Sequence, residues 1–141
     1  MCVDFRDLKN ATVKDALCLI KIDELLDTFK GANIFSTIDL FSGYWQIAMD
    51  AESAEKTAFS TKSGHYHFNV MSFCLCNAPA SFQRVMEAIL KRLIWKCVVI
   101  YLDDIIVYSK TPQDHCDDLF RVLSLLNEAG FKLNKKKCLL G

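Results

Sequence analysis

The segment from Val98 to Ser109, VVIYLDDIIVYS, constrains the possible fold more than any other part of the chain. Two apolar runs rich in β-branched residues flank one polar pair, Asp103 and Asp104, which is typical of two short strands joined by a tight turn. The pattern therefore predicts a β-hairpin with two adjacent carboxylates at its tip. Such carboxylates repel each other, and a divalent cation relieves the repulsion. A plain polar turn is the alternative, since aspartate also favours turns, and a metal site needs further oxygen ligands.

The composition indicates one globular domain without a global preference for nucleic acid. The chain has 141 residues, 52% of them hydrophobic, and its 17 basic and 17 acidic side chains give a formal net charge of zero. Any attraction to phosphates therefore has to come from local patches. Neither a signal peptide nor an apolar run of membrane-spanning length is present, and the seven cysteines show no zinc-type spacing. We expect an intracellular, soluble protein with reduced thiols.

A third carboxylate follows another predicted strand. Residues 34–39 read IFSTID, so that the strand ends on Asp39 shortly before the break at Gly43, and the aromatic residues Tyr44 and Trp45 come next. This order predicts an acid at the mouth of a sheet with aromatic rings beside it. The alternative is that Asp39 caps a short turn and that the rings belong to the core.

Helical spacing and capping residues predict the remaining elements. His65 and His67 share one strand face without a third ligand, so we interpret them as surface or packing residues. The predicted order is an edge strand at 3–5, a helix from Asp23 to a stop at Gly31, the strand 34–39, a β-rich region at 46–70 with a turn at 62–64, a helix at 78–94 with Asn77 near its N-cap, the hairpin 98–108, a helix at 112–129 capped at Thr111, and a strand at 131–134.

This order suits an α+β fold, a ferredoxin-like split βαβ arrangement with two helices on one face of an antiparallel sheet. In such a sheet the hairpin can lie beside the first strand, which brings Asp39 close to Asp103 and Asp104. Three carboxylates at one sheet edge meet the needs of two divalent ions about 3.5–4 Å apart. The arrangement is suited to nucleotidyl transfer.

Four motifs now identify a resemblance. The stretches FSTIDLFSGYWQI, EKTAFSTKSGHYHF, NAPASFQRVM and YLDDIIVYSK closely resemble the successive motifs of reverse transcriptases from Ty3/gypsy-type long-terminal-repeat retrotransposons, over essentially all 141 residues. The resemblance implies a polymerase palm with part of the fingers. Residues 1–14 and 47–78 would belong to the fingers, residues 15–46 and 79–141 to the palm, and the thumb would lie outside this fragment.

The resemblance also implies a two-metal site. Asp39 and Asp103 would hold two Mg²⁺ ions, with Mn²⁺ as a possible substitute. Asp104 would complete the catalytic cluster and belong to the metal site, and the backbone carbonyl of Leu40 would be a further ligand. Tyr44 matches the aromatic residue that lies under the incoming sugar and excludes a ribose 2′-hydroxyl by a steric clash.

Further contacts are implied by position in the same motifs. Phe73 and Cys74 would line the nucleotide pocket with Tyr44, and Cys74 stands where the family has a glycine, so its side chain is expected to crowd the pocket wall or strain the backbone. The residues expected to contact template or primer are Tyr101, Gln83, Arg84 and Lys62, with His65 as a further candidate.

The implied function is RNA-directed DNA polymerisation within a Pol polyprotein of a transposable element. Its partners would be a primed RNA or DNA template, deoxynucleoside triphosphates and the remaining Pol domains (protease, thumb, RNase H and integrase, the last for DNA integration). An intact element would assemble it in a cytoplasmic virus-like particle. Because the primer grip and thumb would lie after Gly141, we expect no primer extension by the isolated chain. The alternatives are an inactive remnant or a co-opted structural module of the same fold, and a palm-type nucleotide cyclase, which the helix motif NAPASFQ argues against.

Overall fold

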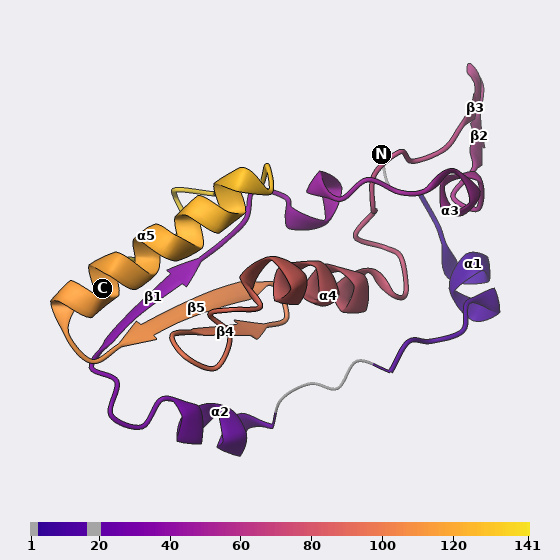
Figure 1. The fold of residues 1–141 in the computed structure, drawn as a ribbon. Coiled ribbons are helices and arrows are strands. Elements are labelled where there is room, and N and C mark those ends of the chain that lie inside the picture. Colours follow the sequence, from indigo (N-terminus) through magenta and orange to yellow (C-terminus); the bar gives the residue numbers. More distant parts are fainter. Residues whose placement is uncertain (1–2, 17–20) are drawn as a thin grey trace.

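A three-stranded antiparallel sheet lies at the centre of the computed structural model, which describes residues 3–16 and 21–141 (Figure 1). Its strands are β1 (Ile34–Ile38), β4 (Val98–Tyr101) and β5 (Asp104–Ser109), in the spatial order β1-β5-β4. The predicted hairpin is thus formed by β4 and β5, and β5 pairs directly with β1. This confirms the predicted α+β fold and the position of the hairpin beside the first strand.

One face of the sheet carries most of the core. Ile38 lies opposite Ile105, which in turn lies opposite Ile100, and all three side chains are at most 2% exposed. Directly opposite residues point to the same face of a sheet. Two helices, α4 (Ala78–Leu90) and α5 (Pro112–Glu128), cover this face with the buried residues Met86, Leu90, Val122 and Leu126. Each such buried side chain contributes about 1.5–3 kcal/mol, so this interface dominates the stability of the fold.

The opposite face is covered in part by the segment that follows α2 (Ile22–Thr28). Phe29 makes edge-on ring contacts with Phe35 of β1 at 5.3 Å and with Tyr108 of β5 at 5.2 Å. The predicted helix is present, but Asp23 lies in its first turn and not at the N-cap. The helix ends at Thr28, three residues before the predicted stop, and Gly31 adopts a φ of +81° in the turn that follows, a conformation that suits glycine.

The two long helices begin where the sequence predicts. The hydroxyl of Thr111 accepts a hydrogen bond from the N–H of Asp114, which caps α5. The side chain of Asn77, at the start of α4, bonds instead to the backbone of Val13 and Asp15, which ties the N-terminal region to this helix. The helix ends at Leu90, four residues earlier than predicted. Within the described residues, no helix is both long enough and apolar enough to cross a membrane.

The N-terminal region and the insertion after β1 differ from prediction. Residues 3–5 form no strand and lead into a helix, α1 (Arg6–Ala11). The region 46–70 contains the predicted hairpin, β2 (Phe59–Thr61) and β3 (Gly64–Tyr66), but also a short helix, α3 (Ala51–Glu55). Asp50 caps α3 by accepting a hydrogen bond of 2.9 Å from the N–H of Ser53. Asp50 in the cap position is the sequence signal that could have indicated a short helix here in place of a strand.

The segment after α5 lies beside β1 but forms no regular strand. The predicted strand at 131–134 is reduced to an isolated antiparallel bridge between Leu40 and Leu133, and a second bridge joins Thr37 to Leu139. The C-terminal segment therefore occupies the fourth-strand position of a ferredoxin-like sheet with only two points of pairing.

A buried histidine joins this segment to the sheet and to α5. His115 is 2% exposed, and its ring lies between the hydroxyls of Ser36 (Nε2, 2.7 Å) and Ser109 (Nδ1, 3.0 Å). Ser109 donates to a carboxylate oxygen of Asp118 at 3.0 Å, so it must accept from Nδ1–H of the histidine. The hydroxyl of Ser36 then donates to Nε2, and its oxygen accepts from the N–H of Gly141 at 3.1 Å. In this network Nδ1 of His115 is the ring nitrogen that donates.

Replacing this histidine is expected to destabilise the fold. His115→Leu leaves the buried hydroxyl of Ser36 without an acceptor, and we expect a loss of about 2 kcal/mol in the free energy of unfolding, measured by urea denaturation. The matched control is His65→Leu at an exposed position of β3, with an expected change of at most about 0.5 kcal/mol. Equal effects of the two substitutions would contradict the prediction.

Candidate active site

The hairpin tip contains one aspartate and not two. The turn between β4 and β5 consists of Leu102 and Asp103, whereas Asp104 is the first residue of β5 and pairs with Tyr101. The prediction of two adjacent carboxylates at the tip was therefore wrong, because the turn lies one residue earlier in the chain than predicted. Leu102 adopts a positive φ of 56°, which two-residue hairpin turns require at their first position and which is strained for leucine. The strain is located next to the carboxylate of the candidate site.

Asp39 reaches the same end of the sheet. It directly follows Ile38, the last residue of β1, and Ile38 is paired with Ile105 next to the hairpin turn. Asp39 and Asp103 consequently line one cavity of about 240 Å³. Asp104 does not line it. Of the three predicted acids, two thus meet at one cavity, although about sixty residues of sequence separate them.

A tyrosine connects the hairpin to the segment after β1. Tyr44 lies in the short 3-10 helix η1 (Gly43–Gln46), and its hydroxyl donates a hydrogen bond to Oδ1 of Asp103. The side chain is only 8% exposed, and its ring makes edge-on contacts with Phe73 at 5.0 Å and with Phe82 at 5.2 Å. Burial, followed by the hydrogen bond and the charge of Asp103, raises the pKa of Tyr44 above its ordinary value. The phenol therefore keeps its proton and remains a donor.

Close packing sets the position of η1. A Cβ atom on Gly43 would lie 2.9 Å from Cε2 of Phe82, whose buried ring belongs to α4. Glycine thus allows η1 to approach the core helix more closely than any other residue could. This approach places the ring of Tyr44 against Phe82 and its hydroxyl against Asp103.

Lys137 is a charged residue of the cavity that the sequence analysis missed. Its Nζ lies 3.7 Å from Oδ2 of Asp39, and it also lines the cavity. The lysine side chain is 68% exposed, so the ion pair adds little stability. In the sequence Lys137 belongs to a run of three lysines, a pattern that usually marks a solvated surface and gives no signal of a site.

Oxygen atoms around the cavity suit a hard divalent cation. Besides the carboxylates of Asp39 and Asp103, the backbone carbonyl of Leu40 is a candidate oxygen ligand, since Leu40 also lines the cavity. Both hydrogen bonds of the bridge between Leu40 and Leu133 are 2.9 Å long and are made by the residues on either side of Leu40. In such a pair the carbonyl of the bridging residue points away from the partner segment, and here it points toward the β5 side. Among the described residues no three acidic, histidine or cysteine side chains form a ready-made metal cluster.

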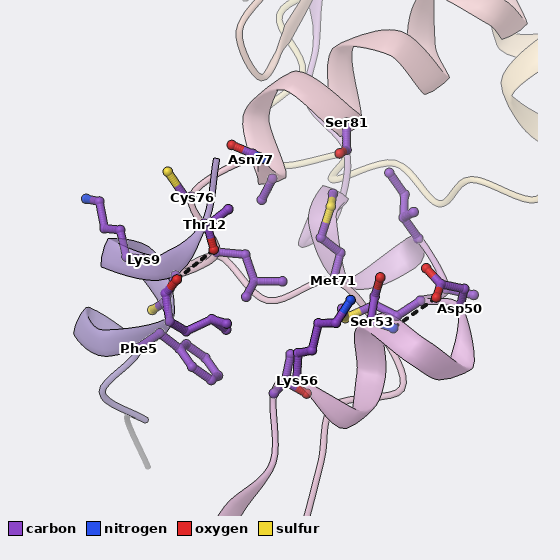
Figure 2. Close-up of a pocket in the computed structure, with 18 residues that line it drawn as sticks. Phe5, Lys9, Thr12, Asp50, Ser53, Lys56, Met71, Cys76, Asn77 and Ser81 are labelled. Atoms are coloured by element: carbon purple, nitrogen blue, oxygen red, sulfur yellow. Dashed lines mark hydrogen bonds between the residues drawn. The ribbon is translucent and has the colours of Figure 1, made fainter. Parts of the chain in front are cut away.

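Cys74 lies in a different cavity from the two aspartates. Phe73 lines the cavity of Asp39, as the sequence analysis expected, but Cys74 lines a neighbouring one of about 300 Å³ between α1, α3 and the start of α4 (Figure 2). Within the described residues, the non-glycine positions with positive φ are Ser42, Trp95 and Leu102. The expected strain at Cys74 is therefore absent, and its exposed side chain does not crowd the wall beside Asp103.

The residues expected to contact template or primer are spread over the molecule. Gln83 and Arg84 line a groove between α4 and β4, but Gln83 is only 3% exposed and Arg84 forms an ion pair with Asp15. Tyr101 lies at the end of β4 beside the turn, half-buried. Lys62 is exposed at the turn of the β2–β3 hairpin, away from the central sheet (Figure 1). The structure does not bring these four side chains together.

Comparison with known proteins gives one consistent result. Residues 1–141 match the family described as reverse transcriptase (RNA-dependent DNA polymerase). The chain is 45% identical over 136 residues to the retrovirus-related Pol polyprotein from transposon 297 of Drosophila melanogaster, covering 96% of the chain and 13% of that protein. It is 41% identical over 140 residues to the enzymatic polyprotein of Cauliflower mosaic virus (strain NY8153), covering 99% of the chain and 20% of that protein.

Solved structures agree with these relatives. The prototype foamy virus protease–reverse transcriptase superimposes on 98% of the chain, and 18% of its own, with a TM-score of 0.83 and 26% sequence identity. A structure of the foamy viral enzyme in complex with an RNA/DNA hybrid superimposes on 97% of the chain, and 18% of its own, with a TM-score of 0.81 and 25% identity. In these four comparisons the chain spans between 13% and 20% of the other protein's length.

The close approach of η1 and α4 gives a testable prediction. Gly43→Ala forces a methyl group against the buried ring of Phe82, and we expect a loss of about 1–3 kcal/mol in the free energy of unfolding by urea denaturation. Phe82→Leu removes the ring atoms concerned and is itself destabilising. The double variant should lose clearly less stability than the sum of the two single losses, because the clash between the methyl group and the ring is gone. Strictly additive losses would refute the steric explanation.

Proposed function

Because the chain belongs to the reverse transcriptase family, we propose that it is the part of an RNA-directed DNA polymerase that carries the catalytic site. The reaction is transfer of a deoxynucleotide from its triphosphate to the 3′-hydroxyl of a primer on an RNA or DNA template, with release of pyrophosphate. The observation that carries the proposal is the meeting of Asp39 and Asp103 at one cavity beside Tyr44. Two distant motifs of the sequence converge there.

In this proposal the chain is a fragment of a Pol polyprotein from a Ty3/gypsy-type retrotransposon. Residues 1–14 and 47–78 belong to the fingers, and residues 15–46 and 79–141 to the palm. The separation of α1, α3 and the β2–β3 hairpin from the central sheet supports this division (Figure 1). The partners are template, primer, deoxynucleoside triphosphate and the other Pol domains, including integrase for DNA integration, and the proposed location is a cytoplasmic virus-like particle.

Asp39, Asp103 and the Leu40 carbonyl hold Mg²⁺ in this proposal, or Mn²⁺ in its place. Carboxylate and carbonyl oxygens are the ligands that such hard cations prefer. When bound, two such ions activate the primer hydroxyl and stabilise the charge on the triphosphate and its leaving group. Asp104 lies outside the cavity, and its role is to add negative potential beside Asp103.

The aromatic wall supports selection of the sugar. Tyr44 and Phe73 are in edge-on contact and line the cavity together with Asp103. A rigid ring at the floor of a nucleotide site rejects an additional hydroxyl group by steric clash. For the template, Arg84 and Lys62 are the better candidates, because they are more exposed than the buried Gln83. Tyr101, at the end of β4, is the candidate for contact with the primer.

A chimeric enzyme tests the proposed reaction. The 136-residue stretch of the chain that aligns with the Pol polyprotein of transposon 297 replaces its counterpart there, and incorporation of deoxynucleotide is measured on poly(rA) primed with oligo(dT). We expect incorporation with Mg²⁺, and a loss of about 100-fold or more in Asp103→Asn, because metal-based charge stabilisation is worth several kcal/mol.

The matched control for this substitution is Asp117→Asn at an exposed position of α5, which should keep the activity of the chimera. Circular dichroism verifies that each variant is folded. A folded chimera without incorporation would identify the chain as an inactive remnant, and equal activity of the Asp103 and Asp117 variants would refute the assigned site.

Sugar selection gives a separate prediction. In the chimera, Tyr44→Ala removes the ring and retains the acidic side chains of Asp39 and Asp103. We expect the preference for deoxynucleotides over ribonucleotides to fall about tenfold or more, measured as the ratio of the two kcat/KM values. An unchanged ratio would exclude Tyr44 as the residue that selects the sugar.

A further inference from the structure

The hydroxyl of Tyr44 contacts the carboxylate of Asp103, although exclusion of a ribose hydroxyl requires only the ring. The hydroxyl donates to Oδ1 of Asp103 across 59 residues of sequence. It therefore joins the segment after β1 to the hairpin turn. A phenylalanine would fill the same space against Phe73 and Phe82 but could not make this hydrogen bond. The effect of the hydroxyl on the site is therefore separate from the effect of the ring.

The two partners differ in how firmly they are held. Asp103 belongs to a two-residue turn and is exposed, so its side chain has few neighbours that select one rotamer. Tyr44 is buried, and two rings and the close approach of Gly43 to Phe82 hold it in place. The tyrosine is thus the rigid partner, and the carboxylate is oriented by it.

The bond also leaves coordination capacity on the carboxylate. The ionised group offers about four lone-pair positions on two oxygens, and a single donor occupies one of them. No hydrogen bond to Oδ2 of Asp103 is found among the described residues, and Asp103 lines the same cavity as Asp39. Asp39, in contrast, is approached by the exposed side chain of Lys137 at 3.7 Å, a weak surface ion pair that a divalent cation can displace.

We propose that the Tyr44 hydroxyl is a positioning group that orients the Asp103 carboxylate for a divalent cation. The inference rests on the proposed function, because it requires Asp103 to be a metal ligand. Partners that hydrogen-bond a ligating carboxylate typically change metal affinity about 10–100-fold when they are removed.

Tyr44 therefore has two separable contributions. The ring shapes the space for the sugar, and the hydroxyl fixes one metal ligand. Tyr44→Phe keeps the first and removes only the second, whereas Tyr44→Ala removes both. This separation makes the inference testable by metal binding alone, independently of nucleotide incorporation.

The experiment is a titration of the 141-residue chain with Mn²⁺, in which free Mn²⁺ is measured by electron paramagnetic resonance. The wild-type chain should bind Mn²⁺ at a site that Asp103→Asn abolishes. Tyr44→Phe should weaken binding at this site about tenfold. The matched control is Tyr66→Phe, which removes the hydroxyl of an exposed tyrosine in β3 and should leave the affinity unchanged. Unfolding midpoints verify that the variants remain folded.

The outcomes separate the inference from the proposed function. If Asp103→Asn abolishes binding while Tyr44→Phe binds as tightly as the wild type, or more tightly, the positioning role is refuted and the metal site stands. Tighter binding would mean that the hydroxyl competes with the cation. If Asp103→Asn leaves Mn²⁺ binding unchanged, or the wild-type chain binds none, the metal site itself is refuted, and the positioning role with it.

Discussion

The antiparallel pairing of β1 with β5 is the constraint on which the rest of the structure depends. Ile38 opposite Ile105 places two fully buried side chains under α4 and α5, and the next residues along the two strands are acidic. Because side chains alternate between faces, a shift by one residue would expose the isoleucines and bury the acids. Hydrophobic burial therefore fixes the register, and the register places Asp39 beside the hairpin.

The site is assembled from this register and from close packing. The approach of Gly43 to Phe82 holds η1 against α4, and Tyr44 then spans the remaining distance to Asp103. The C-terminal segment contributes Lys137 from the other side and is joined to the sheet by only two bridges and the His115 network. Gln46 of η1 also makes two hydrogen bonds to the backbone of Lys132, so the C-terminal wall is tied to the segment that carries Tyr44.

Local sequence patterns predicted the long elements well and the short ones poorly. The apolar stripe of α4, the cap of α5 at Thr111 and the alternation of the β4–β5 hairpin each depend on several residues that agree. The five-residue helix α3 depends mainly on one cap, at Asp50, and was mistaken for strand. The turn between β4 and β5 lies one residue before its predicted position. A φ of 56° is locally unfavourable for leucine, so the sequence did not indicate a turn at Leu102, and the tertiary pairing of the strands overrides that preference.

The sequence by itself determined the α+β class, the order of the elements, the family to which the chain belongs and the identity of the acids that form its candidate site. Tertiary structure decided which of them meet. Asp39 and Asp103 line one cavity, Asp104 lies outside it as the first residue of β5, and Cys74 lines a different cavity. These outcomes depend on strand register and on contacts across sixty or more residues, such as the bond from Tyr44 and the ion pair from Lys137. Such contacts leave no periodic trace in the chain, because periodicity reports only which face of an element is buried.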